Sequence, residues 1–199
     1  MARNDKFDYY ILKKQYQSFG YENIINLEGE TVAKILFPLY HPNHLVELQE
    51  VRSNSVFFIQ KNRSLFHKKY VLIKSSNDVH AIIRVRKQPQ FKNIASLETI
   101  KGLEKYFAVG NLKKWSYHII DESESIIAQV YNLKNSKIIP EHINEVSKHY
   151  CIKIASKKMP IILISFVMTI NNLSYHGIAN IAGIERRIAR LRPFGPRKV

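Results

Sequence analysis

The feature that most constrains the fold of this chain is an apolar run at residues 159–170, close to the end of the sequence. The run is 12 residues long and stops at Asn171 and Asn172. A helix that crosses a membrane needs roughly 20 apolar residues, whereas 10–14 is typical of a helix buried in a protein core. Pro160 is favourable in the first turn of a helix. The sequence therefore predicts a buried helix here and no transmembrane span.

The polar side chains in this region support the same interpretation. Ser165, Thr169 and Asn172 are four and then three residues apart, so they fall on one face of a helix. A helix with so narrow a polar stripe is buried nearly all round. Because Ile and Val dominate the run, a buried pair of strands over 160–164 and 166–170 is the alternative.

The rest of the chain is dominated by strand-like segments. They are short, rich in Ile, Val, Tyr and Phe, and several alternate apolar with polar residues, which is the pattern of a half-buried strand. Polar clusters between them are typical of turns. The predicted strands are residues 9–14, 31–37, 55–60, 69–75, 79–87, 115–121, 125–131 and 150–155.

Two of these regions form an internal repeat. The segments ENIINLEGETVAKI (22–35) and YHIIDESESIIAQV (117–130) align without a gap, and YVLIKSSNDVHAIIRV (70–85) is a looser copy with a longer turn. A repeated unit of strand, turn and strand predicts an antiparallel meander. A meander of eight or more strands must close or stack to hide its edges.

Two further segments have helix-like patterns. Residues 96–106 open with Ser96, a suitable N-cap, although Gly102 interrupts the pattern. Residues 140–150 open with Pro140 and Glu141, both favourable in a first helical turn. We expect helices in both places.

In their order along the chain these segments resemble the LURP-one-related proteins of the tubby-like superfamily, which also includes phospholipid scramblases. The resemblance covers residues 9–176. It implies a mostly β fold, a closed antiparallel barrel of about twelve strands around a central hydrophobic helix at 160–174. The expected organisation is a barrel domain over 1–176 and a basic tail over 177–199. The segments that carry the resemblance are YYILKKQYQSFGYENIINLEGETVAKI, IIRVRKQPQF, HIIDESESIIAQV, YCIKIA and PIILISFVMTINNL.

The chain is strongly basic. Its net charge is +15 and its pI is near 9.8, with an excess of +6 over residues 1–100 and +9 over 101–199. Such a field attracts polyanions, either an anionic membrane surface or nucleic acid. A solvated basic surface without a specific ligand is the alternative. A lone cysteine and a charged N-terminal segment predict a cytoplasmic protein, peripheral at a membrane if lipid is the partner.

The resemblance to tubby domains, which bind phosphoinositide headgroups through one barrel face, implies a basic ligand site. The matching residues are Arg84, Arg86, Lys87 and Lys92. On a strand Arg84 and Arg86 point to the same side, about 7 Å apart, and two guanidinium groups at that spacing can hold phosphate oxygens. Solvated arginines are the alternative, and a nucleic-acid phosphate suits the site equally.

The tail adds six basic residues against Glu185. If residues 184–192 are helical, Ile184, Ile188 and Leu191 share one face, and the other face has Arg186, Arg187 and Arg190. A basic amphipathic helix suits an anionic membrane or a partner protein, and an Arg-rich arm also suits RNA. A tail that packs on the barrel or stays mobile is the alternative. The predicted tail contacts are Arg186, Arg187, Arg190 and Arg192.

Catalytic, cofactor and metal sites are not predicted. In related scramblases an acidic calcium-binding stretch precedes the last helix, but here Lys157 and Lys158 occupy that place, and they would repel Ca²⁺. His41 and His44 lack a second pair of ligands at zinc spacing. His149 and Cys151 would share one side of a strand without a group to orient them. We therefore expect a non-enzymatic module for anionic phospholipid headgroups, with a nucleic-acid-associated protein as the alternative.

Overall fold

The computed structural model describes residues 7–13, 21–36, 44–62, 68–85, 95–100, 103–111, 114–136, 139–155 and 160–171. These residues form a mostly β structure with twelve strands and an α-helix that follows them. The strands are β1 (Phe7–Lys13), β2 (Tyr21–Ile25), β3 (Thr31–Leu36), β4 (His44–Glu50), β5 (Val56–Asn62), β6 (Lys68–Lys74), β7 (Val79–Val85), β8 (Ala95–Thr99), β9 (Lys105–Asn111), β10 (Ser116–Asp121), β11 (Ile126–Asn132) and β12 (His149–Ala155).

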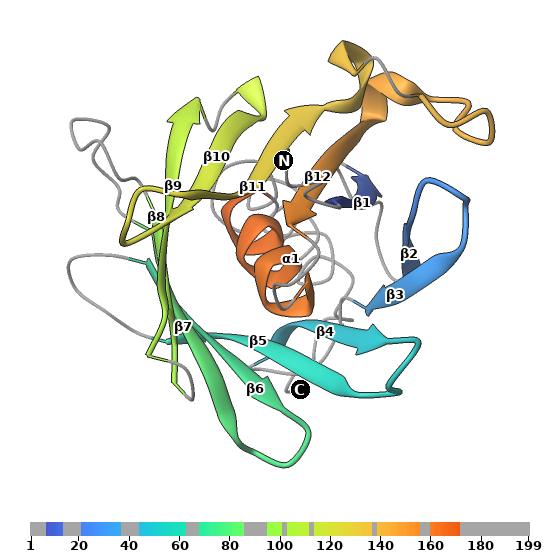
Figure 1. Ribbon diagram of the computed structural model, residues 1–199. Coiled ribbons are helices and arrows are strands. Elements are labelled where there is room, and N and C mark those ends of the chain that lie inside the picture. Colours follow the sequence, from blue (N-terminus) through green and yellow to red (C-terminus); the bar gives the residue numbers. More distant parts are fainter. Residues whose placement is uncertain are drawn as a thin grey trace, which may run out of the picture.

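The twelve strands close into one antiparallel barrel (Figure 1). Each strand pairs with its neighbours in the sequence, and β1 pairs with β12 from Phe7–Ala155 to Lys13–His149. This closure leaves no open edge on the sheet. The seam between β1 and β2 is the thinnest in the described wall, because the two strands share the single pair Ile11–Ile25.

Helix α1 (Pro160–Met168) runs through the interior of the barrel (Figure 1). Every residue from Ile161 to Met168 is buried, and a π-helical turn at 169–171 continues the helix. The hydroxyls of Ser165 and Thr169 donate to backbone carbonyls four residues earlier, each at 2.7 Å. These bonds satisfy polar groups that would otherwise be unpaired in an apolar core. The central helix is therefore confirmed, and the alternative of two buried strands is excluded.

No helix within the described residues is both long and apolar enough to cross a membrane.

The alternation of apolar residues along the strands builds the wall of the core. In β7, for example, Ala81, Ile83 and Val85 are buried, whereas Ile82 and Arg84 between them are partly exposed. The inward side chains pack with those of α1 in one continuous cluster. All eight strands predicted from the sequence are present.

The internal repeat corresponds to three hairpins with the same register. The pairs Ile24–Ala33, Leu72–Ala81 and Ile119–Ala128 occupy equivalent positions in β2–β3, β6–β7 and β10–β11. Just beyond each pair the register shifts by one residue, which forms a β-bulge. The copy at 70–85 therefore has the same turn length as the others, and the longer turn expected for it is wrong.

The turns of these hairpins explain the polar part of the repeat. In each turn the N–H of the first residue donates to the carbonyl of the fifth, and the fourth residue has a positive φ. Side chains of the first residue reinforce two of them, because Asp121 accepts from the N–H groups of Ser123 and Ser125, and Asn26 accepts from that of Glu30. Such Asx turns select Asn or Asp at this position. The residues with positive φ are Gly29, Asn77 and Glu124.

The topology gives the barrel two different ends. We call the end with the five tight turns, at 26–30, 50–55, 74–78, 99–104 and 121–125, the hairpin mouth. We call the opposite end the connection mouth, where the strand ends are joined by residues 14–20, 37–43, 63–67, 86–94, 112–115 and 133–148. Helix α1 begins at the hairpin mouth, where Pro160 and Val51 line the same cleft. It ends toward the connection mouth, where Asn171 contacts Tyr117 near the start of β10.

Both additional helix predictions are wrong. Residues 96–106 belong to the β8–β9 hairpin, in which Ala95, Leu97 and Thr99 are buried at a period of two. Residues 140–150 form turns, the short 3₁₀ helix η3 (Val146–Lys148) and the start of β12. With the 3₁₀ helix η2 (Leu133–Asn135), this connection supplies apolar side chains that cover the outer face of β1 and β12. The apolar residues in it serve this small second core.

Removing the largest side chain of α1 should strongly destabilise the barrel. Phe166 is fully buried, so Phe166→Ala should lower the free energy of unfolding by about 3–5 kcal/mol through lost burial and the cavity left behind. Chemical denaturation followed by tryptophan fluorescence measures this. The control is Leu103→Ala, because Leu103 is 87% exposed and its truncation should change stability by about 0.5 kcal/mol or less. Equal effects of the two substitutions would contradict the central position of the helix.

Candidate anion-binding surface

Arg84 lies on the outer face of β7 and is already paired with a carboxylate. Its Nη1 atom is 2.5 Å from Oε2 of Glu98 on β8, and both side chains are about one-third exposed, at 31% and 35%. Lys105 on β9 approaches the other oxygen of Glu98 at 3.6 Å. Three neighbouring strands thus bring two cations around one carboxylate. The local charge is positive but partly neutralised.

The ion pair changes the titration of Glu98. The hydrogen bond from Arg84 is the largest cause that lowers the pKa of this carboxyl group, and the charges of Arg84 and Lys105 add to it against the opposing effect of burial. Glu98 therefore stays ionised at neutral pH. An anionic ligand at Arg84 must compete with this carboxylate, which weakens Arg84 as an independent phosphate anchor.

The other predicted ligand contacts lie outside the described residues. These are Arg86, Lys87 and Lys92, together with the tail residues Arg186, Arg187, Arg190 and Arg192. The structure therefore places Arg84 alone among the eight predicted residues. Sequence reasoning missed Glu98 and Lys105 as its neighbours, because both belong to the segment that was expected to be helical.

The described barrel is close to electrically neutral. It contains 13 of the 31 lysines and arginines, and 14 of the 16 aspartates and glutamates. The remaining residues hold 18 basic and two acidic side chains, so they carry the whole positive excess. The described barrel taken as a whole therefore has no positive excess. The charge lies in the connections and termini.

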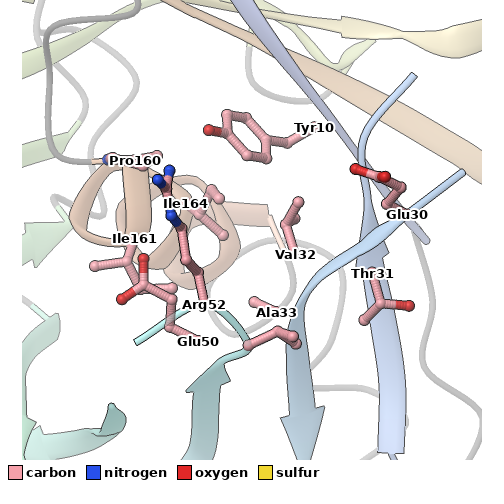
Figure 2. A pocket seen from close by; sticks show the side chains of 11 residues that line it. Tyr10, Glu30, Thr31, Val32, Ala33, Glu50, Arg52, Pro160, Ile161 and Ile164 are labelled. Atoms are coloured by element: carbon pink, nitrogen blue, oxygen red, sulfur yellow. The ribbon is translucent and has the colours of Figure 1, made fainter. Parts of the chain in front are cut away.

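A cleft of about 370 Å³ opens at the hairpin mouth, next to the thin β1–β2 seam (Figure 2). Ile161 and Ile164 of α1 and the β3 residues Val32 and Ala33 form its apolar part. Polar side chains surround the apolar part of the cleft. Two of them are glutamates and one is an arginine, so the lining has no net positive charge. The cleft therefore does not suit an anion. The polar residues in the lining are Tyr10, Glu30, Thr31, Glu50 and Arg52.

Tyr10 in this cleft is held in its neutral form. Burial, followed by the negative charges of Asp8 and Glu50, raises the pKa of its hydroxyl to about 12. The group remains a hydrogen-bond donor at neutral pH and is not a base.

The helix end at the connection mouth contains a buried polar pair. The hydroxyl of Tyr117 donates to Oδ1 of Asn171 at 3.0 Å. Nδ2 of Asn171 has no hydrogen-bond partner among the described residues. An amide here, without a negative charge, gives no support to a cation site at this end of the helix.

The described residues do not assemble a catalytic or metal-binding set. Cys151 is buried under the β11–β12 connection, and burial raises the pKa of its thiol to about 11, so it is not a thiolate at neutral pH. Nδ1 of the nearby His149 lies 2.8 Å from the carbonyl oxygen of Glu145. No cluster of three or more His, Cys, Asp or Glu in this part of the chain could hold a metal. His41 and the side chain of His44 lie outside it.

Comparisons with known proteins identify the fold only. No family model matches the chain, and no curated protein matches it. Among solved structures, the chain is similar to a protein from Arabidopsis thaliana determined by X-ray crystallography, with a TM-score of 0.58 and 11% sequence identity. The match covers 85% of this chain and 92% of the Arabidopsis chain. At so low an identity the similarity shows a shared architecture.

Removing Arg84 should raise the pKa of Glu98 toward its ordinary value. Because this pKa is lowered in the folded state, the ion pair stabilises the fold above about pH 4.3 and loses its effect as Glu98 is protonated. For so exposed a pair we expect about 1 kcal/mol or less. NMR titration of the carboxyl carbon in Arg84→Gln measures the shift. Lys13→Gln is the control, because Lys13 pairs with Glu22 instead. An unchanged titration in Arg84→Gln would contradict the assignment.

Proposed function

We propose that this chain is a non-enzymatic module that docks its connection mouth on an anionic phospholipid surface. We further propose that it belongs to the LURP-one-related group of the tubby-like superfamily. The closed barrel around a central helix supports this assignment, because it is the architecture that the sequence resemblance implies. The setting would be the cytoplasmic face of a membrane, with the protein bound peripherally.

The observation that carries the proposal is the unequal charge of the two mouths. The six connections that join strand ends at the connection mouth contain ten Lys or Arg and two Asp or Glu. The five turns of the hairpin mouth contain three Lys or Arg and eight Asp or Glu. The first mouth therefore has an excess of +8, and the second has an excess of −5. Lys157 and Lys158, which the sequence places between β12 and α1, reduce this acidic excess without reversing it.

A barrel with this polarity has a preferred orientation in the field of an anionic membrane. The connection mouth is attracted, and each Lys or Arg near the surface contributes about 1 kcal/mol. The hairpin mouth is repelled. Asn171, at the end of α1, lies toward the connection mouth, so the Arg-rich tail would start on the attracted side. The predicted contacts Arg86, Lys87 and Lys92 belong to the connection that follows β7.

The nucleic-acid alternative uses the same charges, so salt dependence cannot separate the two partners. Anionic vesicles and RNA must be compared directly, by co-sedimentation with phosphatidylserine-containing vesicles and by a gel-shift assay with single-stranded RNA. The proposal expects binding to the anionic vesicles and little binding to phosphatidylcholine vesicles. Tight RNA binding without vesicle binding would replace the lipid proposal with the nucleic-acid one.

Two matched triple substitutions test the orientation. Arg86→Gln, Lys87→Gln and Lys92→Gln together remove three charges from the connection mouth and should lower the affinity for anionic vesicles about tenfold or more. Arg52→Gln, Lys74→Gln and Lys101→Gln remove the same charge from the hairpin mouth and should leave affinity within about twofold if that mouth faces away. Equal losses would refute a membrane-facing connection mouth.

A further inference from the structure

The exposed apolar side chains of the barrel gather at the hairpin mouth. Single exposed aliphatic residues are common on protein surfaces, but a cluster usually marks an interaction site. Of the seven large apolar residues that are exposed in the described part of the chain, Ile139 is the one that belongs to the other end. The six at the hairpin mouth are Phe7, Val51, Val79, Ile100, Leu103 and Ile126.

Four of these residues lie on three consecutive hairpins, which we call the hairpin arc: residues 75–79, 100–104 and 121–126. The hairpins are adjacent in the barrel, and the N–H of Ile100 donates to the carbonyl of His80 at 3.0 Å, which joins the first two. In the second turn Leu103 is 87% exposed and has a φ of 50°. That left-handed conformation favours Gly or Asn over a bulky residue. A leucine thus stands at the tip against the local backbone preference.

The same arc is acidic. Its carboxylates are Asp78 in the first turn, Glu104 in the second, and Asp121, Glu122 and Glu124 in the third. Within the arc the sequence has one basic residue, Lys101, and Lys74 directly precedes the first segment. An anionic membrane would be repelled here in spite of the apolar tips. The chemistry suits a segment that is apolar on one face and cationic on the other.

We propose that the hairpin arc binds residues 184–192 of the same chain. This segment, IERRIARLR, has four arginines and one glutamate, and Ile184, Ile188 and Leu191 fall on one face if it is helical. The apolar face would rest on the exposed tips, and the arginines would approach the carboxylates that flank them. The net charges of segment and arc, +3 and −4, are complementary.

The dimensions agree with this pairing. A helix of nine residues is about 14 Å long. The second and third hairpins of the arc, β8–β9 and β10–β11, together span three strand spacings, which is also about 14 Å. A helix of this length therefore covers the turns that contain Leu103 and Glu122, and the first turn lies beside it. Twelve residues, 172–183, separate the end of α1 from the segment, and they reach about 40 Å when extended. That exceeds the roughly 23 Å length of a seven-residue strand, so the tail can pass from one mouth to the other.

The docked tail would compete with the membrane. Its arginines cannot face the arc and an anionic surface at the same time, so an anionic surface would draw the tail away and free the arc. This competition rests on the proposed function, but the docking itself does not.

Protection of the tail in the full-length chain tests the docking. An arginine-specific protease cuts within 184–192, and mass spectrometry follows loss of the C-terminal fragment. Glu122→Lys should speed this cleavage about two- to fivefold, the range expected from losing exposed charge pairs. Glu28→Lys is the matched control, because it makes the same charge change in the equivalent β2–β3 turn outside the arc. Leu103→Asn should also speed cleavage, because it removes an apolar tip while suiting the positive φ.

Each outcome decides the proposal. Faster cleavage in Glu122→Lys and Leu103→Asn, with the wild-type rate in Glu28→Lys, supports docking on the arc. Equal rates in all four proteins would overturn it. If the tail is cut more slowly as the protein concentration rises, docking within one chain is overturned. The tail then docks on a second copy of the protein. Adding phosphatidylserine vesicles should change the wild-type rate. If the arc variants behave as expected and vesicles have no effect, the lipid proposal fails and the docking stands.

Discussion

The burial of α1 inside the closed sheet is the interaction on which the rest of the structure depends. A barrel of eight strands is just wide enough for its own side chains to fill, so a barrel of twelve requires additional material in its interior. The helix supplies it, and Phe166, Val167 and Met168 are completely buried there. In return, a helix that is apolar all round needs a wall on every side. Neither the sheet nor the helix can bury its apolar side chains without the other.

This dependence explains which parts of the fold could be predicted from the sequence. The 12-residue length of the apolar run and the alternation in the strands both reflect burial, and both were interpreted correctly. The repeat was also informative, because its Asx turns require particular residues such as Asn26 and Asp121. Segment 96–106 has a misleading local pattern, since Ser96 resembles an N-cap. Residues 95, 97 and 99 are buried at the period of two that is typical of a strand. Three positions are too few for this strand pattern to outweigh the N-cap signal.

The candidate site was less predictable for a physical reason. Arg84 was correctly placed on a strand, but its partner Glu98 comes from the next strand in the barrel, and only the pairing of β7 with β8 brings them together. The charge difference between the mouths has the same origin. The sequence shows basic residues spread along the chain, but most of those between strands fall in the connections at one end of the barrel, and most acidic ones fall in the turns at the other end. Cross-strand topology, which no local pattern encodes, therefore determines the electrostatics.

The position of α1 after all twelve strands also has a consequence for biosynthesis. The chain emerges from the ribosome with its N-terminus first, so β1 emerges long before β12. These two strands pair to close the barrel. Helix α1, which fills the barrel, emerges after β12. Until then the nascent strands must keep their apolar faces from aggregating, and pairing between distant segments is intrinsically slow. We therefore infer that the native state is reached only after translation has passed α1, and that chains terminated before it are substrates for chaperones or proteases rather than smaller working domains.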